Sequence, residues 1–193
     1  MVFLDVETTG LDAQKDRVIE VGLVKIDKNG KTETYSQLIN PGFKISKEIR
    51  DLTGIKYKEL TKAPFFDEVL PQLTELLRVD LFVAHNAKFD YDFISSEFQR
   101  LQTPISLPYI DTVKLAKAFY PNYLTYNLDS IITRLKLKID KRHRALDDSQ
   151  VLVSLYQRIM KEFGEDELFS AIDKYIVQPK NKQVIDTTQA MLF

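Results

Sequence analysis

The chain has 193 residues, of which 44% are hydrophobic and 28% are charged, and its formal net charge is -1 at pH 7. Such a chain suits one globular domain with a short appendage, and its charge gives no overall sign of a polyanion-binding protein, although a local basic face would be enough. The absence of cysteine excludes disulfides, thiolate zinc sites and cysteine nucleophiles. With no signal peptide and no apolar run long enough to span a bilayer, we expect a cytoplasmic protein that does not contact a membrane.

The first part of the sequence predicts three consecutive strands. Residues 2–6 form a short apolar run rich in β-forming residues, and residues 18–26 continue in the same way. The dipeptide Asn29-Gly30 is a strong hairpin signal, and residues 32–39 alternate as a returning strand would. We therefore expect a three-strand antiparallel meander.

Helical patterns and two short strands follow. Ser46 and Gly54 frame a short helix over residues 46–52, as its N-cap and its terminator. Apolar spacing predicts further helices at 67–77, 89–101, 112–119, 127–134, 145–163 and 166–175, and short strands at 81–84 and 109–110. Asn127 is expected to be the N-cap of the helix that it begins. Strands followed by helices alternating with strands predict an α/β fold, in which parallel strands extend the meander into a mixed β-sheet flanked by helices. We assign this domain to residues 1–175.

The first unusual feature is a pair of acids on an apolar strand. Asp5 and Glu7 stand at alternate positions, so both carboxylates point to the same side of the strand. Two like charges at the end of a half-buried strand are costly unless a cation holds them. Solvation of the strand end would explain the pair as simply, so the pair alone does not indicate a site.

Two later clusters bring acids to the start of predicted helices. In residues 85–90, Asp90 falls in the first turn of a helix that follows a short strand, a common place for a surface acid favoured by the helix dipole. In residues 143–148, His143 lies on a loop and Asp148 lies early in the longest helix. Two core candidates follow Asp148 three and four residues later, so this acid faces inward.

Taken in order, the three clusters resemble the DEDD exonuclease superfamily and its histidine subclass, the DnaQ-like proofreading exonucleases. The strings that carry the resemblance are Asp-Val-Glu-Thr-Thr-Gly at 5–10, His-Asn-Ala-Lys-Phe-Asp at 85–90 and His-Arg-Ala-Leu-Asp-Asp at 143–148. Each string alone is a weak motif, but the three together, within residues 2–163, are specific. The tyrosine subclass has Tyr where this chain has Arg144, so the histidine subclass fits better.

The resemblance implies a ribonuclease H-like fold and a metal-dependent 3′→5′ exonuclease activity. It implies that Asp5, Glu7, Asp90 and Asp148 hold two divalent ions, Mg²⁺ or Mn²⁺, which suit oxygen ligands. By this resemblance Asp5 bridges both ions, Glu7 and Asp148 complete the ion that binds the nucleophilic water, and Asp90 supports the second. His143 is then the general base that takes a proton from that water, and a surface histidine is the alternative.

Further contacts with the nucleic-acid strand are implied by the resemblance. The residues concerned are Thr8, Thr9, Leu11, Thr53, Asn86 and Phe89. The backbone at Thr8 and Thr9 would meet the terminal 3′-hydroxyl. Leu11 would be an apolar wedge between the last two bases. Thr53 belongs to a loop over the terminal nucleotide, where the family often has His. Asn86 either binds a phosphate or caps a helix, and Phe89 either stacks on a base or belongs to the core.

A basic stretch precedes and flanks the histidine of the third cluster. Its members are Lys136, Lys138, Lys141, Arg142 and Arg144. It either holds phosphates of the strand or is a solvated loop.

The last residues carry a second motif. Residues 176–193 turn polar, and we interpret them as a flexible C-terminal tail. The tail ends in Gln189, Leu192 and Phe193, which resemble the pentapeptide that docks replication and repair proteins onto the sliding clamp. The two apolar residues would fill a pocket and the glutamine would bind at its rim. A tail that packs on its own domain is the alternative.

Together these features predict an enzyme that hydrolyses single nucleotides from DNA 3′ ends, single-stranded or frayed, in proofreading or repair. The sliding clamp or a polymerase is its expected protein partner. The first alternative is an RNA-trimming enzyme of the same superfamily, such as ribonuclease T or oligoribonuclease, and contacts to the 2′-hydroxyl would decide between the two. The second is a non-catalytic replication adaptor, against which the complete set of four carboxylates and a histidine argues.

Overall fold

The first three strands form the meander that the sequence predicts. The computed structural model describes residues 1–179. Strand β2 (Val18–Ile26) pairs antiparallel with β1 (Val2–Thr8) and with β3 (Thr32–Leu38). The Asp27 carboxylate accepts hydrogen bonds from the backbone N–H groups of Asn29 and Lys31, and Gly30 takes a left-handed φ of 77°, so this turn is built as its sequence indicates.

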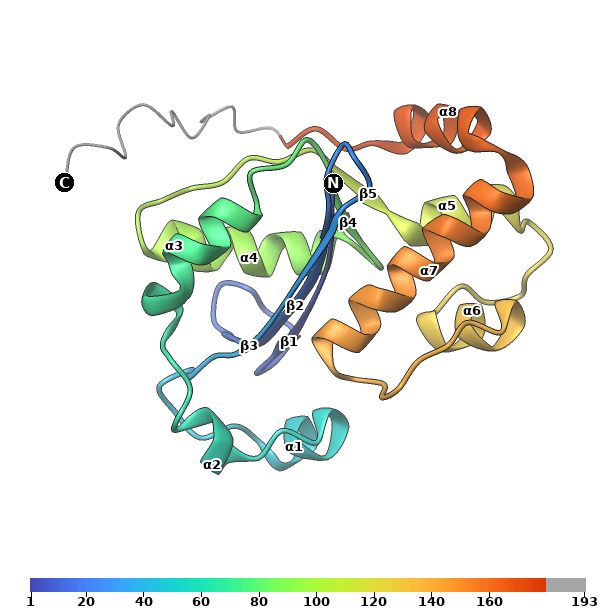
Figure 1. Ribbon diagram of the computed structural model, residues 1–193. Helices are drawn as coiled ribbons and strands as arrows, with labels where there is room; N and C mark the ends of the chain where they lie inside the picture. Colours follow the sequence, from blue (N-terminus) through green and yellow to red (C-terminus); the bar gives the residue numbers. More distant parts are fainter. Residues whose placement is uncertain (180–193) are drawn as a thin grey trace.

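Two parallel strands complete a five-stranded sheet with the order β3-β2-β1-β4-β5 (Figure 1). Strand β4 (Phe82–Ala84) pairs parallel with β1, and β5 (Tyr109–Asp111) pairs parallel with β4. The predicted α/β fold with a mixed sheet is therefore confirmed. The C-terminal ends of β1 and β4 share one edge of the sheet, because parallel strands end on the same side.

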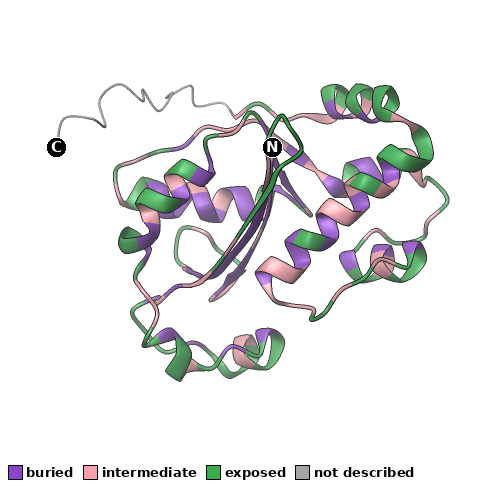
Figure 2. Ribbon diagram, viewed as in Figure 1, coloured by how far each residue is buried: buried purple, intermediate pink, exposed green. Residues whose placement is uncertain are grey.

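Helices cover both faces of the sheet (Figure 1), and much of the ribbon of its strands is coloured as buried in Figure 2. On one face, α3 (Phe66–Leu76) and α4 (Lys88–Arg100) pack against Val2, Leu4 and Val6. On the other face, Phe3 belongs to a core shared with α5 (Thr112–Phe119), α6 (Leu128–Leu135), α7 (Ala145–Phe163) and α8 (Glu165–Tyr175). Because side chains alternate along a strand, Asp5 and Glu7 lie on the same face as Phe3, the face that α7 covers.

The helix caps agree with the sequence in three places. The Ser46 hydroxyl accepts a hydrogen bond at the start of α1 (Lys47–Thr53), and Asn127 does the same at the start of α6. Gly54 ends α1 with a left-handed φ of 70°. One helix, α2 (Tyr57–Leu60), was not predicted, because four residues are too few to show a helical period.

Strand β1 runs two residues further than the apolar pattern predicts. Glu7 pairs with Glu20 of β2, and a register irregularity follows between Glu7 and Thr8. The strand therefore carries both of its acids inside the sheet and not at a solvated end. Backbone pairing with β2, which the side-chain pattern does not report, extends it.

Beyond α8 the chain stays on the sheet as far as it is described. Val177 forms an antiparallel bridge with Tyr109 at the outer edge of β5. Within residues 1–179, no helix combines the length and the apolar character needed to cross a membrane. The predicted clamp-binding residues, Gln189, Leu192 and Phe193, lie outside the described residues.

Candidate active site

The five residues singled out by the motifs line one cavity of about 680 Å³. Asp5 and Glu7 enter it from β1, and Asp90 from the first turn of α4. Asp148 enters from the first turn of α7, and His143 from the loop before that helix. Three stretches of sequence that are far apart thus converge at the C-terminal edge of the parallel strands.

Asp90 is fixed to the strand beside it. Its carboxylate Oδ1 accepts a hydrogen bond from the backbone N–H of Val6 at 3.1 Å, and the residue is only 3% exposed. The bond ties the start of α4 to the middle of β1 and leaves the second carboxylate oxygen available to the cavity.

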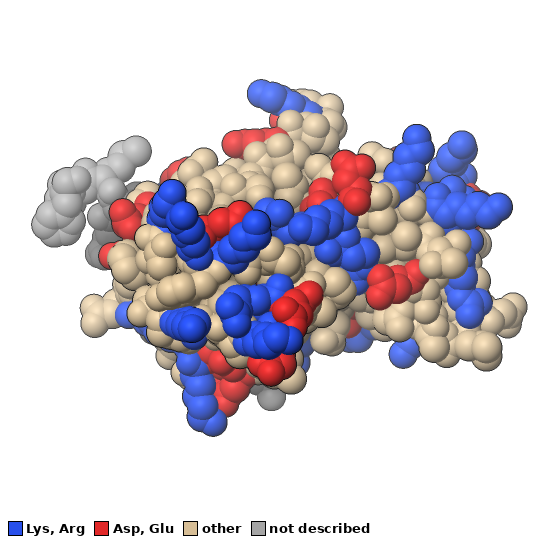
Figure 3. Space-filling view, turned by 90° about the horizontal axis from the view of Figure 1, so that it is seen from below, with Lys and Arg blue, Asp and Glu red and all other residues tan. Residues whose placement is uncertain are grey.

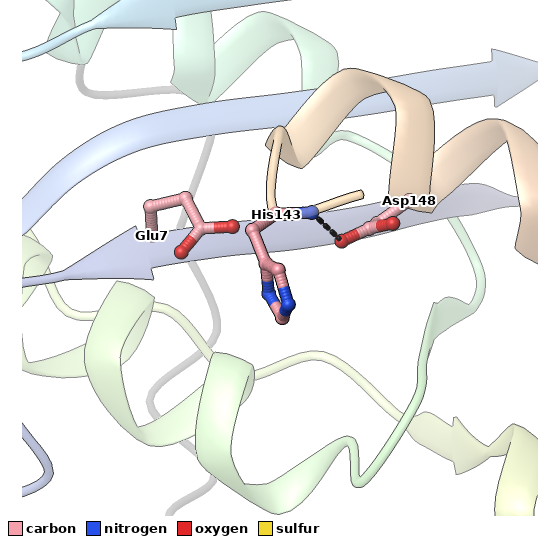
Figure 4. Close-up of side chains that lie close together, drawn as sticks. All are labelled: Glu7, His143 and Asp148. Carbon is pink, nitrogen blue, oxygen red and sulfur yellow. Dashed lines mark hydrogen bonds between the residues drawn. The ribbon is translucent and has the colours of Figure 1, made fainter. Parts of the chain in front are cut away.

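Glu7, His143 and Asp148 form the tightest group. Each offers one atom of its side chain, and these three atoms lie within 4.8 Å of one another. The backbone N–H of His143 donates to Asp148 Oδ2 at 3.2 Å, and His143 holds a left-handed φ of 58° (Figure 4). The acid of α7 therefore fixes the turn that carries the histidine into the site.

The acids of the cavity lack enough positive charge to balance them. Burial raises the pKa of Asp5 well above its ordinary value, and the carboxylates of Asp90, Asp148 and Glu7 raise it further. Burial raises the pKa of Asp90 in the same way. Burial, followed by the charges of Asp148 and Glu20, raises the pKa of Glu7 to about 8. Such a cluster favours the binding of cations, because a cation relieves both the repulsion and the desolvation.

One cation of the chain already faces these acids. The Arg142 guanidinium forms an ion pair with Asp148, and its Nε donates to Asp129 at 2.6 Å. Arg142 lies inside the cavity and lowers the pKa values of Asp148 and Glu7, against the stronger effect of burial. The sequence placed it only in a basic stretch, and its position next to His143 was the one signal that it belongs to the site.

Arg144 has a structural role instead of the predicted one. Its guanidinium binds the Glu20 carboxylate through Nε at 3.1 Å and Nη2 at 2.7 Å, and the backbone N–H of Ala145 donates to the same carboxylate at 3.2 Å. Glu20 is only 1% exposed, so the acid of this ion pair is buried. Acids of the protein therefore bind both Arg142 and Arg144, so the alternative of a simply solvated loop does not describe these two residues.

Two predicted substrate residues lie where a strand could reach them. Asn86 and Phe89 line the cavity, and Phe89 also lines a neighbouring hollow together with Leu11, whose side chain is 88% exposed. Phe89 is half-buried against Phe93, with ring centroids 4.8 Å apart, so it belongs in part to the core, and its stacking on a base stays a prediction. Asn86 takes a left-handed φ of 61°, and α4 begins after Ala87 without a side-chain cap, so the cap expected of Asn86 is absent.

The three predicted threonines use their hydroxyls locally. Thr8 donates to a carbonyl in the turn after β1 at 2.6 Å, and Thr9 donates to a carboxylate in that turn at 3.1 Å. Thr53 is 2% exposed; its hydroxyl donates to the Ile49 carbonyl at 2.9 Å and accepts from the N–H of Ile55 at 3.1 Å. The side chain of Thr53 closes α1 and does not face the cavity, which corrects its predicted side-chain contact with a nucleotide.

Other cavity-lining residues carry no motif. They come from α5 and the loop that follows it, and they include Val113, Lys117, Leu124 and Tyr126. Only the packing of α5 beside the parallel strands brings them to the site, so a local reading of the sequence could not find them.

Comparisons with known proteins identify the family of the chain. The RNase T family model, described as "Exonuclease", matches residues 2–156. A "DNA polymerase III PolC-type" of Thermotoga maritima is 38% identical over 191 residues, which are 97% of this chain and 13% of that protein. A protein of the same name from Clostridium perfringens is 32% identical over 165 residues, which are 86% of this chain and 11% of that protein. The chain therefore spans only a small part of the curated relatives it matches.

Solved structures agree as well. "Exonuclease X in complex with 5′ overhanging duplex DNA" is 25% identical, with a TM-score of 0.67, over 88% of this chain and 98% of that one. The nuclease domain of 3′hExo, "a DEDDh family member, bound to rAMP", has a TM-score of 0.72 at 20% identity, over 85% of this chain and 92% of that one, and so supports the fold alone. From the match of the RNase T exonuclease model to residues 2–156, the chain belongs to the exonuclease family that this model describes.

Proposed function

We propose that this protein is a 3′→5′ exonuclease that removes single nucleotides from the end of a DNA strand with the help of two divalent metal ions. The observation that supports the proposal best is the convergence of four carboxylates and a histidine in one cavity, in a chain of the exonuclease family. No positively charged residue but Arg142 pairs with the acids of this cluster in the described part of the chain.

The residues present fit divalent ions. Glu7, His143 and Asp148 each offer one ligand atom, and these atoms lie within 4.8 Å of one another. Carboxylate oxygens without thiolates suit Mg²⁺ or Mn²⁺. When bound, two such ions supply an activated water, stabilise charge on the phosphate and assist the leaving oxygen.

The positions of the acids support a division of roles. The charges of Asp90, Asp148 and Glu7 all raise the pKa of Asp5, which suits a residue that would contribute to holding both ions. Glu7 and Asp148 would hold the ion nearest His143, because one oxygen of each lies within 4.8 Å of a ring nitrogen of His143. Asp90, fixed through one oxygen to β1, would support the second ion through its other oxygen.

His143 is the proposed general base. Replacing His143 by Gln should reduce the rate of DNA degradation by about 10²- to 10⁴-fold, the usual contribution of a positioned base. Mn²⁺ affinity, measured by calorimetry, should change little if the ring moves a proton and does not hold the ion. A large loss of Mn²⁺ affinity would instead make His143 a metal ligand, which its distance from Glu7 and Asp148 also allows.

Arg142 should compete with a metal ion for Asp148. The positive charge of Arg142 repels a metal ion bound at Asp148. Two unit charges about 4 Å apart interact by about 4 kcal/mol at an effective dielectric constant of 20. Removing about a third of such a repulsion would tighten metal binding about tenfold. We therefore expect Arg142→Gln to bind Mn²⁺ about tenfold more tightly in calorimetry and to unfold at a lower temperature without metal. Lys141→Gln is the matched control, because Lys141 is exposed on the same loop and does not line the cavity. Equal Mn²⁺ affinity in both variants would refute the competition.

DNA is the proposed substrate, and proofreading or repair the proposed setting. The support is the similarity to polymerases named DNA polymerase III and to an exonuclease solved with DNA. A polymerase is therefore a proposed partner. Docking of Gln189, Leu192 and Phe193 on a sliding clamp is a further proposal, tested by the affinity of the last 15 or so residues for the clamp, which replacing Leu192 and Phe193 by Ala should abolish.

The decisive experiment compares three substrates, each labelled in turn at the 5′ and at the 3′ end. Single-stranded DNA, duplex DNA with a frayed 3′ end and RNA are incubated with and without Mn²⁺. A ladder of shortening 5′-labelled DNA, dependent on Mn²⁺, is expected. Preferred degradation of RNA would support the exoribonuclease alternative, and no degradation by the parent protein would support the adaptor.

A further inference from the structure

The cavity that holds the acids has a second region of opposite character. Lys117, in the last turn of α5, and Leu124 and Tyr126, in the loop between α5 and α6, line the same cavity as the four carboxylates. This region thus offers one cation, one apolar side chain and one aromatic ring. None of its side chains is acidic, so it does not suit a metal ion.

Lys117 is held in place without an acid. Its Nζ lies 5.6 Å from the centroid of the Tyr126 ring, and the Tyr126 hydroxyl donates to the Tyr120 carbonyl at 2.8 Å, which anchors that ring. Within residues 1–179 no carboxylate lies within ion-pair distance of Lys117, whereas Arg142, the cavity's other long cation, is bound by Asp129 and Asp148. The charge of Lys117 is therefore free for a ligand.

Leu124 adds an apolar surface beside this charge. Its side chain is 89% exposed although it lines the cavity. A base of a single strand offers an apolar face of the kind that such a side chain covers, and a phosphate offers the charge that a free lysine binds. A nucleotide carries both groups.

The surrounding surface also suits a strand that continues past the cavity. Figure 3 shows the face that carries α1 and α2, where Lys and Arg cover a larger area than Asp and Glu. The basic patches of this face would attract a polyanion.

Resting on the proposed exonuclease function, we propose that Lys117 binds a non-scissile phosphate of the DNA strand and that Leu124 packs against the adjoining base. The scissile phosphate belongs to the carboxylate end of the cavity, and the next phosphates on its 5′ side reach the Lys117 end. Lys117 is thus a positioning residue that sets how the strand lies across the site.

The test compares Lys117→Gln with Lys114→Gln. Lys114 is exposed on the same helix but does not line the cavity, so it controls for the loss of a charge on α5. Binding of a fluorescent oligothymidylate is measured by anisotropy at several salt concentrations with Mn²⁺, in a His143→Gln background that slows degradation. Each phosphate contact on a single strand contributes about 0.7 to the slope of log affinity against log salt. Lys117→Gln should lower the slope by about 0.7, and Lys114→Gln should leave it unchanged.

A second measurement locates the contact. Oligonucleotides with one neutral methylphosphonate at the first or second position 5′ of the scissile phosphate are bound to the protein with Lys117 intact and to the Lys117→Gln variant. If Lys117 binds the phosphate at one of these two positions, a methylphosphonate there should make the protein with Lys117 and the Lys117→Gln variant bind with equal affinity. Without the background substitution, Lys117→Gln should raise KM several-fold with little change in kcat.

The outcomes separate this inference from the proposed function. An unchanged salt slope in Lys117→Gln, or a difference that persists with both methylphosphonates, would overturn the inference while degradation by the parent protein stands. A parent protein that neither binds nor degrades the strand would overturn the proposed function first. Leu124→Ala tests the apolar contact: weaker binding of the strand with an unchanged salt slope is expected, and unchanged affinity would exclude that contact.

Discussion

Asp5→Asn should reduce DNA degradation by about a thousandfold or more, and it should make the metal-free protein more stable at neutral pH. The loss follows from the proposed place of Asp5 between both ions, because a few kcal/mol of charge stabilisation in the transition state correspond to about a thousandfold in rate. The gain follows from the removal of a negative charge that Asp90, Asp148 and Glu7 oppose. Rate and stability should therefore change in opposite senses.

The gain in stability expected for metal-free Asp5→Asn can be tested through the pH dependence of unfolding. Folding raises the pKa of Asp5 well above 3.8 and that of Glu7 from 4.5 to about 8. Between about pH 4.5 and 8 the folded protein therefore binds more protons than the unfolded chain. The free energy of unfolding should therefore fall as the pH rises from about 4.5 to 8 in the presence of a chelator. Asp5→Asn should flatten this decline, because one of the groups that cause it no longer ionises.

Urea unfolding at pH 5, 6, 7 and 8 with a chelator measures the effect on stability, and single-turnover degradation with Mn²⁺ measures the effect on rate. Asp147→Asn is the matched control, since Asp147 lies beside Asp148 in the first turn of α7 but does not line the cavity. The control should keep its activity. Stability that increases with pH in the parent protein, or an active Asp5→Asn variant, would contradict the proposed arrangement.

Much of the site follows from local rules. The alternation along β1 correctly places Asp5 and Glu7 on one face, and the helical spacing after Asp148 correctly turns that residue inward. Both predictions rest on a repeat within one element, the alternation of side chains along a strand or the turn of a helix. The order of residues in the sequence shows such a repeat directly. The convergence of these residues in one cavity came from the resemblance, since no local period relates β1 to α4 or α7.

The errors have different physical origins. Arg142 and Arg144 are basic in sequence, but acids from distant elements bind them, and Thr53 is polar but turns inward to close its own helix. Lys117 and Tyr126 carry no motif and reach the cavity through the packing of α5. For the two arginines, Lys117 and Tyr126, contacts between elements decide the role, and neighbouring residues in the sequence do not show such contacts. For Thr53, local hydrogen bonds to Ile49 and Ile55 decide it.

Two buried acids hold the helices of the site at their positions. Glu97 of α4 accepts hydrogen bonds from Arg17 at 2.8 and 2.9 Å and from the N–H of Val18 at 3.1 Å. Glu20 of β2 accepts from Arg144 and from the N–H of Ala145. The first pair secures the helix that carries Asp90, and the second secures the start of the helix that carries Asp148. Breaking one partner of such a pair leaves a buried charge, so these contacts fix geometry more than they add stability.

Gly22→Ala should destabilise the protein by about 3 kcal/mol or more and should also disturb the site. Gly22 of β2 stands opposite Asp5 in the sheet, and the first turn of α7 crosses the sheet at this glycine. A Cβ atom added at Gly22 would lie 2.0 Å from the backbone carbon of Ala145 and 2.0 Å from the nitrogen of Leu146. Those atoms belong to the backbone and cannot turn aside, so α7 must shift, which exceeds the usual cost of overpacking, about 1–3 kcal/mol.

The shift would carry Asp148 and His143 away from Asp5, because both depend on the start of α7. We therefore expect weaker Mn²⁺ binding and slower degradation under conditions where Gly22→Ala is still folded, both compared with Gly30→Ala. In Gly30→Ala the added Cβ meets open space, but residue 30 has a left-handed φ of 77°. This control should therefore lower the free energy of unfolding by about 1 kcal/mol through backbone strain alone. Its activity should stay intact. Equal unfolding free energies for the two variants, measured in urea, would show that α7 does not rest on Gly22 and that another contact positions Asp148.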